Sequence, residues 1–226
     1  YAEIFWNDQK RNGKTLYDSQ RTLRERNYFG ALMVKSGDAD AMLSGYSRNY
    51  PAVIKPILES IGPAKGVSRV AATNLMLTKR GPIFLSDTSI NINPSAKELA
   101  KIAQMTARTV KIFGLHPVLA MLSYSNYGSS DFPEATKITD AVKFLHRYYP
   151  DIEVDGPIQS DFALNKKMLK TSFPFSQLSK KNVNTLIFPN LDSANITYKL
   201  MKELDGTLSI GPILMGLNAP VHILQL

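Results

Sequence analysis

The run Val118-Leu119-Ala120-Met121-Leu122 consists of five apolar residues in succession. Successive side chains of a strand point to opposite faces of a sheet, so a strand of this composition is buried on both faces. Both faces of its sheet then need a covering layer, and in parallel sheets helices supply that layer. The run therefore predicts an α/β fold.

Short apolar runs alternate with segments of helical period along the chain, which is typical of α/β architecture. The clearest helix spans 93–114, where Ser95 and Glu98 form a capping-box pattern and Gly114 follows the last turn. Two β runs joined by "KRG" predict a hairpin within 67–91. Further helices are expected at 15–27, 28–36, 51–61, 132–150 and 191–206, and further strands at 41–44, 118–122, 151–156, 185–190, 211–216 and 219–226.

The composition excludes several kinds of site. The chain has no cysteine, so disulfides, thiolate metal sites and cysteine nucleophiles are excluded. No run approaches the roughly 18–20 apolar residues of a membrane span, and we expect a cytoplasmic protein without membrane contact. The formal net charge of +8 fits an anionic ligand and a plain solvated surface equally well. The basic residues are scattered and follow no recognition pattern for nucleic acid, so no nucleic-acid partner is expected.

Catalytic motifs are missing from the sequence. His116, His146 and His222 lack the spacing of metal ligands, and no metal site is expected. The chain contains no G-x-S-x-G elbow, no Walker-type phosphate loop and no G-x-G-x-x-G after a strand. Residue chemistry alone indicates a ligand-binding α/β domain with an anionic ligand.

Polar side chains follow several of the expected strands. Hydroxyls and a glycine occupy 123–130 after the apolar run, Asn190 and Asn195 follow the strand at 185–190, and Arg48 follows the strand at 41–44. Such loops can hold an anion with backbone N–H groups and a helix dipole. The same residues are also ordinary turn and helix-cap chemistry. The strand ends define a possible binding rim and no particular reaction.

Six longer motifs follow one another between about Asn27 and Leu226: "YFGALMVKSGDADAMLSG", "FLSDTSINI", "AMLSYSNYGSS", "EVDGPIQSDFALN", "LIFPNLDSANITYKL" and "GPILMGLNAPVH". In this order and spacing they resemble the phosphotransacetylases, which move an acetyl group between acetyl phosphate and coenzyme A. The stretches "RNYPAVIKPIL" and "PVHILQ" resemble the phosphotransacetylase-like carboxyl-terminal domain of NADP-dependent malic enzymes.

The resemblance implies a two-lobed α/β fold with central, mostly parallel sheets, like that of isocitrate and isopropylmalate dehydrogenases. We expect 1–62 to be a partial first lobe with a linking helix, 63–210 the second lobe, and 211–226 a strand returning to the first lobe. Because the chain starts at Tyr1 and its last residues read as a strand, we also expect a fragment of a longer protein.

The resemblance also bears on catalysis. Gln225 stands where that family has its catalytic serine, and Leu226 stands where it has an arginine. A glutamine amide cannot move a proton as a tuned acid or base can, and losing the arginine removes a donor fork for the phosphoryl group. No catalytic residue is therefore assigned. A regulatory acetyl-CoA-binding domain is expected, with an active phosphate acetyltransferase and a structural dimerisation module as alternatives.

The family binds CoA in the cleft between its lobes, and the matching positions here are candidate ligand residues. They are Ser44, Gly45, Arg48, Ser123, Ser125, Asn126, Gly128, Ser129, Asn190 and Asn195. Acetyl-CoA or CoA is the expected ligand, and a homodimer through the second lobe is expected, with a higher oligomer in the parent protein. No cofactor is assigned to these residues, since NADP and a divalent metal (Mg or Mn) belong to the malate-oxidising domain of the parent.

Overall fold

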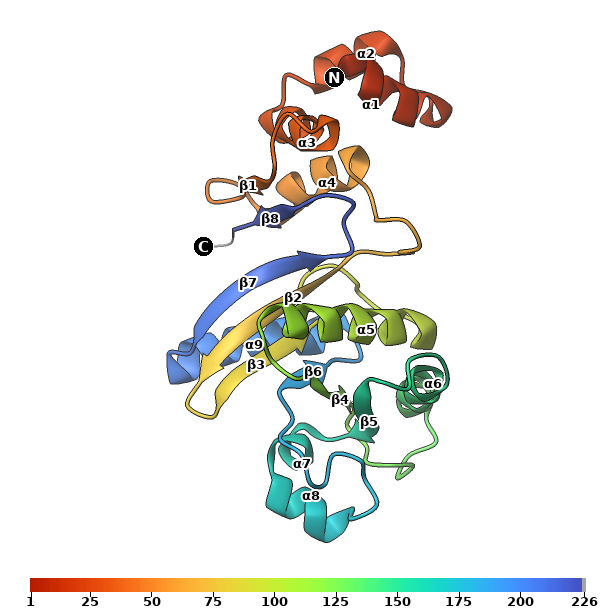
Figure 1. Cartoon of the computed structure of the whole chain (residues 1–226), viewed down its shortest axis with the longest axis vertical. Helices are drawn as coiled ribbons and strands as arrows, with labels where there is room; N and C mark the ends of the chain where they lie inside the picture. The colour runs from red at the N-terminus through yellow and green to blue at the C-terminus, as the bar shows by residue number, and fades with distance from the viewer. Residues whose placement is uncertain (225–226) are drawn as a thin grey trace. The chain divides into compact units, whose positions relative to one another are not determined.

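The computed structural model describes residues 1–224, with the side chain of Asp205 excepted, and the chain divides into two compact units. Unit 1 comprises Tyr1–Val70 and the carboxyl-terminal segment from Gly211, and unit 2 comprises Ala71–Ile210. Figure 1 shows the helices of unit 1 in red and orange and the sheet of unit 2 in yellow, green and blue.

Unit 1 consists mainly of short helices around one pair of parallel strands. Ser44 lies opposite Ile223 in that pair, and Leu224 N donates to Ser44 O at 2.7 Å. The elements are α1 (Ala2–Gln9), η1 (Lys10–Asn12), α2 (Leu16–Thr22), α3 (Arg26–Ser36), β1 (Met42–Ser44), α4 (Tyr50–Ser60) and β8 (Val221–Ile223).

The single helix expected over 15–27 is wrong, because α2 ends at Thr22 and α3 begins at Arg26. The Glu25 carboxylate accepts hydrogen bonds from the N–H groups of Asn27 and Tyr28, so it caps a new helix. A carboxylate at a helix start also meets the positive end of the helix dipole. The charged pattern through the break is therefore two helices in succession.

The interior of unit 1 forms where α1, α3 and α4 bury their apolar faces. Phe5, Leu32 and Ile57 are fully buried, and burying a side chain of this size stabilises by about 1.5–3 kcal/mol. The Tyr28 ring packs edge-on against Phe5 with centroids 5.4 Å apart, and its hydroxyl donates to Glu59 Oε2 at 2.6 Å. Burial and this carboxylate raise the pKa of the Tyr28 hydroxyl.

Unit 2 is built on a mixed sheet with the strand order β5-β4-β6-β3-β2-β7. Strands β5, β4, β6 and β3 pair in parallel, while β2 and β3 form the antiparallel hairpin that the sequence predicts. Its elements are β2 (Ala71–Thr78), β3 (Gly81–Ser86), α5 (Ala96–Ile112), β4 (Val118–Leu122), α6 (Pro133–Tyr148), β5 (Glu153–Ile158), α7 (Ser160–Leu164), α8 (Lys166–Ser172), β6 (Thr185–Ile187) and α9 (Leu191–Asp205), followed by β7 (Leu208–Met215), which continues into unit 1.

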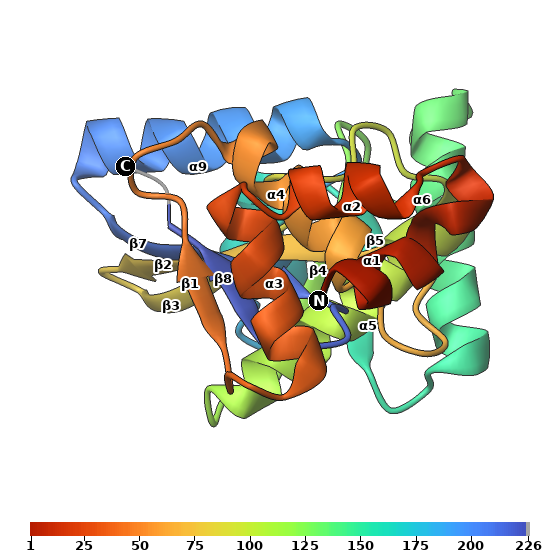
Figure 2. The ribbon, with the colours of Figure 1, turned by 90° about the horizontal axis from the view of Figure 1, so that it is seen from above.

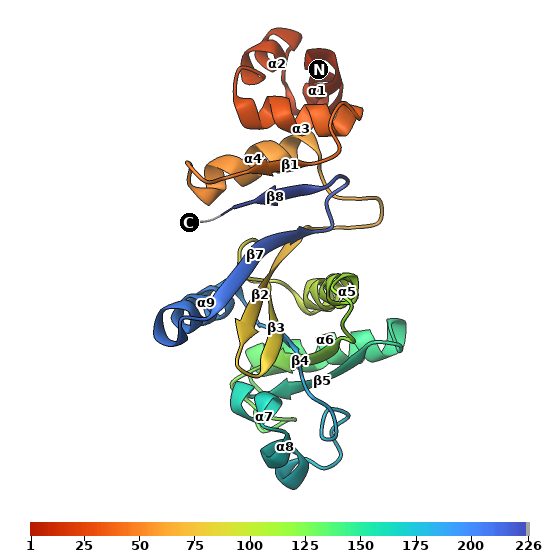
Figure 3. The ribbon, with the colours of Figure 1, turned by 60° about the vertical axis from the view of Figure 1, so that its left-hand side comes forward.

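The apolar run that predicted the fold is β4, and all of its residues are buried. Leu119 and Met121 face a core formed with α5 and α6, whereas Ala120 and Leu122 face a core formed with α7, α8 and α9. Figures 2 and 3 show α5 and α9 on opposite sides of the β2–β3 hairpin. Helices cover both faces of the sheet, as the composition of β4 predicts.

Helix α5 starts as the sequence predicts. Ser95 Oγ accepts from Glu98 N, and the Glu98 carboxylate accepts from Ser95 N at 2.8 Å. The sequence did not predict α7 and α8, which are too short for a clear helical period. Within residues 1–224, no helix combines the length and the apolar character needed to cross a bilayer.

Candidate functional site

The carboxyl ends of the parallel strands of unit 2 lie at one edge of the sheet, and several predicted residues lie there. Strand β4 lies between β5 and β6 in the sheet. The loop Ser123–Ser130 after β4, called the serine loop below, therefore has the strand ends before Gln159 and Asn190 as neighbours. In open α/β sheets, ligands bind at this edge.

The serine loop closes on itself through its own polar groups. Ser125 is buried, and its hydroxyl lies 2.9 Å from that of Ser129. Asn126 N donates to Ser129 Oγ at 3.0 Å, and Ser129 N donates to Asn126 O at 2.9 Å. The Ser123 hydroxyl accepts from Ser125 N at 3.3 Å. These serines lie together in one loop, and their main partners are one another.

Asn126 is held by two hydrogen bonds to Gln159, the residue that follows β5. Asn126 Nδ2 donates to Gln159 Oε1 at 2.7 Å, and Gln159 N donates back to Asn126 Oδ1 at 2.8 Å. Gln159 Nε2 also donates to Tyr124 O at 2.7 Å. The sequence analysis missed Gln159, because only the pairing of β4 with β5 brings it to this loop.

A β-bulge at Gly156 sets the position of the loop. Ala120 pairs with Asp155 and Leu122 pairs with Ile158, so β5 has one extra residue at this point. Gly156 adopts a φ of +147°, and a Cβ there would lie 2.5 Å from Met121 O. Only glycine fits this close approach.

Beyond the bulge, the backbone of β5 binds the serine loop directly. Ser123 N donates to Ile158 O at 3.0 Å, and Tyr127 N donates to Pro157 O at 2.9 Å. The bulge therefore determines where the start and the middle of the serine loop meet β5.

Tyr127 anchors the serine loop to the segment after α8. Its ring packs against Phe173 and Phe175 with centroid distances of 5.0 and 5.1 Å. Its hydroxyl donates to Ser176 Oγ at 2.6 Å, and Ser176 Oγ donates to Asp155 Oδ2 at 2.8 Å. Burial raises the pKa of Tyr127 to about 12, so the hydroxyl stays protonated at neutral pH. The following residue, Gly128, has a φ of +86° and continues the turn.

Asn190 and Asn195 each have a structural role. Asn190 caps α9, because its Oδ1 accepts from Ser193 N at 3.0 Å. Asn195 Nδ2 donates to Thr88 O at 3.1 Å and ties α9 to the loop after β3. Capping and tethering account for both side chains without a ligand.

A buried carboxylate lies in the loop after β3. Asp87 accepts from the N–H groups of Ala72, Ser89, Ile90 and Asn91 at 3.0–3.2 Å. Burial raises the pKa of the Asp87 carboxyl, and the hydrogen bonds from Ser89, Asn91 and Ala72 act in the opposite direction. This carboxylate organises the loop, and its partners are these four backbone N–H groups and the side-chain amide of Asn91.

Lys137 supplies a cation at the same edge of the sheet. Its ammonium donates to Asn93 Oδ1 at 2.8 Å and to Pro189 O at 2.9 Å, so it joins the loops after β3 and β6. Burial lowers the pKa of Lys137, and Glu134 nearby acts against that shift. No sequence signal marks this residue, because it lies inside the helical pattern of α6, near the amino-terminal end of the helix.

In unit 1, Ser44 and Gly45 lie together at the end of β1. Ser44 Oγ donates to Oδ1 of the buried Asn27 at 2.6 Å. Gly45 has a φ of +120°, and a Cβ there would lie 2.2 Å from Leu224 O. Glycine is required at this position by the approach of the chain after β8.

Arg48 lies on the turn that follows β1, close to the start of α3. Its Nη1 forms an ion pair with Glu25 Oε1 at 2.6 Å, and Asn27 Nδ2 donates to the same oxygen at 2.9 Å. Both charged side chains remain partly exposed. A guanidinium carries five N–H donors, so this pair orients Arg48 and leaves it donors for an anion.

The chemistry available at these positions is binding by hydroxyls, amides and cations. Among residues 1–224, no three His, Asp or Glu side chains gather as metal ligands would. Gln225, at the position of the expected catalytic serine, and Leu226 lie outside the described residues.

The chain is similar to proteins of known families. The model of the phosphate acetyl/butaryl transferase family matches residues 1–226. The chain is 37% identical over 210 residues to an NAD-dependent malic enzyme of Rhizobium meliloti, covering 92% of this chain and 27% of that protein. It is 36% identical over 226 residues to an NADP-dependent malic enzyme of Escherichia coli, covering 99% of this chain and 30% of that protein.

Among solved structures, a phosphotransacetylase from Streptococcus pyogenes matches with a TM-score of 0.90 and 39% identity. The match covers 96% of this chain and 67% of that one. The chain thus spans less than a third of each malic enzyme and about two thirds of the solved phosphotransacetylase.

Proposed function

The chain belongs to the phosphate acetyl/butaryl transferase family, and we propose that it binds acetyl-CoA or CoA as the regulatory domain of an NADP-dependent malic enzyme. The observation that carries this proposal is the combination of two sequence facts. Malic enzymes of Rhizobium meliloti and Escherichia coli align with nearly the whole chain, and Gln225 and Leu226 replace the serine and arginine that the family resemblance assigns to catalysis.

In this proposal the parent protein oxidises malate to pyruvate, and the ligand of this domain changes its activity. NADP and a divalent metal act in the remainder of the parent, and no residue of this chain is assigned to them. The coupling between the two sites is reciprocal in binding free energy and typically amounts to about 1–3 kcal/mol. A cytoplasmic location is part of the same proposal.

The proposal includes a fold of the two-lobed type found in isocitrate and isopropylmalate dehydrogenases. Arg48 and the serine loop are the residues proposed to bind the ligand. Arg48 donates to a phosphate of CoA through the N–H groups that Glu25 does not use. The serine hydroxyls rotate freely about their Cβ–Oγ bonds and can turn from one another to an anion. Asn190 and Asn195 contribute through the loops that they tie together.

The test is calorimetric titration of acetyl-CoA into the chain and into three variants. Arg48→Ala is expected to weaken binding about tenfold, equivalent to about 1.4 kcal/mol. Arg11→Ala, an exposed arginine on η1 in the same unit, removes the same charge and is expected to bind as the unmodified chain does.

Glu25→Gln separates ligand binding from structure. The amide keeps an acceptor for the α3 cap but removes the charge that competes for Arg48, so binding is expected to hold or tighten. If Arg48→Ala and Glu25→Gln weaken binding equally, the ion pair has a structural role alone and the proposal fails. Acetyl phosphate formation from acetyl-CoA and phosphate would instead establish an active acetyltransferase.

We also propose that the chain forms a homodimer through unit 2. Ile196, Leu200 and Leu204 follow one another at helical spacing on α9 and are 57%, 51% and 83% exposed. A second copy would remove this apolar stripe from water. Analytical ultracentrifugation of Leu200→Glu is expected to show monomers where the unmodified chain shows dimers, and a monomeric unmodified chain would contradict the proposal.

A further inference from the structure

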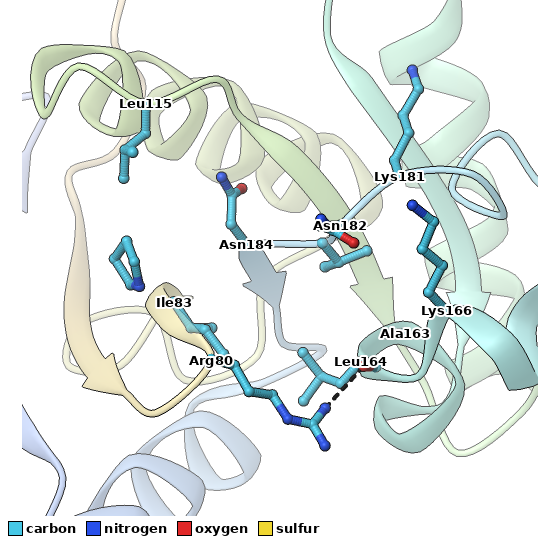
Figure 4. Close-up of a pocket in the computed structure, with 11 residues that line it drawn as sticks. Arg80, Ile83, Leu115, Ala163, Leu164, Lys166, Lys181, Asn182 and Asn184 are labelled. Atoms are coloured by element: carbon cyan, nitrogen blue, oxygen red, sulfur yellow. Dashed lines mark hydrogen bonds between the residues drawn. The ribbon is translucent and has the colours of Figure 1, made fainter.

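A cavity of about 410 Å³ opens at the edge of the unit 2 sheet opposite the serine loop. It lies where β3 and β6 begin, and we call it the amino-edge pocket. Its walls include Arg80, Ile83, Leu115, Lys166, Lys181 and Asn182 (Figure 4). Ligand pockets in proteins typically measure about 300–1,000 Å³, so this cavity has the size of a small-molecule site.

The floor of the amino-edge pocket is fixed by Asn184, just before β6. Asn184 Oδ1 accepts from Val118 N at 2.9 Å, and Asn184 Nδ2 donates to His116 O at 2.8 Å. The amide therefore clamps the segment that leads into β4 and keeps that wall in place. A pocket formed between clamped strand ends is preorganised, which lowers the entropic cost of binding.

Three cations line the amino-edge pocket, and one carboxylate neutralises one of them. Lys181 pairs with Glu153 at 2.7 Å. Arg80 Nη1 donates to the Leu164 carbonyl at 3.0 Å, as the dashed line in Figure 4 shows, and this neutral partner leaves its charge uncompensated. The side chain of Lys166 makes no hydrogen bond or ion pair with the described residues. The pocket thus carries a net positive charge, which attracts anions.

The remainder of the lining is apolar. Ile83, Leu115, Leu164 and Val183 contribute aliphatic surface beside the cations. A second cavity of about 500 Å³ shares Arg80, Ile83 and Leu164, and its further lining includes Lys79, Asp161, Met168 and Met201. Apolar walls with a few convergent charged groups suit a ligand with a compact hydrophobic body and a charged end.

We propose that the amino-edge pocket binds a small organic phosphate, a phosphate monoester with a compact apolar body. Lys166 holds the phosphate, because its ammonium lines the pocket without a carboxylate partner among the described residues and matches a charge of about −2. Lys181 lies on the same side of the pocket as Lys166, and Arg80 adds a third cation from the opposite side (Figure 4). The site is separate from the serine loop, since the two lie at opposite ends of the strands of the sheet.

Phenyl phosphate is the probe that tests the proposal. Calorimetric titration into the full chain is expected to show saturable binding, weakened at least tenfold by Lys166→Gln and less strongly by Arg80→Gln. Lys167→Gln is the matched control, because Lys167 is the exposed next residue of α8 and does not line the pocket. Its affinity is expected to equal that of the unmodified chain. Benzyl alcohol, which lacks the charge, is expected to bind at least tenfold more weakly.

Amide chemical shifts locate the bound probe. Phenyl phosphate is expected to move the resonances of Ile83, Leu115 and Val183. Shifts confined to the serine loop would place the probe at the other edge of the sheet and overturn the proposal. The proposal also fails if no saturable binding appears at millimolar concentration, or if Lys167→Gln weakens binding as much as Lys166→Gln. These outcomes do not depend on acetyl-CoA binding.

Discussion

Replacing Gly156 by alanine tests whether the β-bulge positions the serine loop. The new Cβ would lie 2.5 Å from Met121 O and 3.0 Å from Met121 Cβ. Contacts this short to backbone oxygen are not tolerated, so β5 must move away from β4. Ser123 and Tyr127 donate to Ile158 and Pro157 just beyond the bulge, and their hydrogen bonds are the first to be lost.

The size of the effect follows from two contributions. A side chain held at a φ of +147° carries a strain of about 1–3 kcal/mol. Each of the two backbone hydrogen bonds that the serine loop makes to β5 contributes about 0.5–1.5 kcal/mol net. Together they predict that Gly156→Ala lowers the free energy of unfolding by about 2–6 kcal/mol.

Gly81→Ala is the control, because it separates strain from collision. Gly81 has a φ of +104°, yet a Cβ there meets no atom of the described chain within 4 Å. This variant is expected to lose only the strain contribution of about 1–3 kcal/mol. Urea denaturation followed by circular dichroism gives the free energy of unfolding for both variants, provided that their m-values agree.

Hydrogen exchange adds a local reading of the same change. The amides of Ser123 and Tyr127 are expected to exchange faster in Gly156→Ala and to be unchanged in Gly81→Ala. If the two variants lose equal stability, or if both amides keep their protection in Gly156→Ala, the bulge does not position the loop and the reasoning is refuted.

Two further substitutions test single contacts. Tyr127→Phe removes the hydrogen bond to Ser176 and is expected to lower the free energy of unfolding by about 1 kcal/mol. The difference in ultraviolet absorbance between the two folded proteins is expected to titrate near pH 12, and a midpoint near 10 in the folded protein would contradict burial of this hydroxyl. The Lys181 partner holds the pKa of Glu153 below its usual range, with His116 adding to the effect. Their ion pair therefore stabilises the fold above about pH 4.3 and is lost as the pH falls through the lower folded pKa. The unmodified chain is expected to lose up to about 1 kcal/mol more than Glu153→Gln between pH 5 and 3, and parallel stability curves in denaturant titrations would refute this role.

The parts of the fold that the sequence predicted are those where one local signal dominates. The apolar run of β4, the hairpin of β2 and β3, and the capping box of α5 each depend on a few neighbouring residues. The break between α2 and α3 escaped prediction because Glu25 reads as one more charged residue in a helical pattern. Its capping role becomes visible only once its carboxylate is seen to accept the N–H groups of Asn27 and Tyr28.

The sequence predicted which polar residues follow the strand ends, but not the hydrogen bonds that these residues make. The rule that polar residues gather at the ends of parallel strands brought the serine loop and Asn190 to one edge of the sheet. Sequence spacing contains no information about Gln159, whose partner Asn126 lies 33 positions away. The contacts of Lys137 were not predicted for a similar reason, since a lysine within a helix usually makes no hydrogen bond to a distant segment.

A bound phosphate is expected to affect the hydrogen bonds of the serine loop and the Arg48–Glu25 ion pair differently. A neutral hydroxyl pair such as Ser125–Ser129 contributes about 0.5–1.5 kcal/mol, whereas a hydrogen bond to a charged group contributes about 1.5–3 kcal/mol. A phosphate oxygen can therefore draw a serine hydroxyl away from its neighbour. The same phosphate has no such advantage over the Glu25 carboxylate that holds Arg48 at 2.6 Å. An anionic ligand is thus expected to add to the Arg48–Glu25 pair and to rearrange the serine loop.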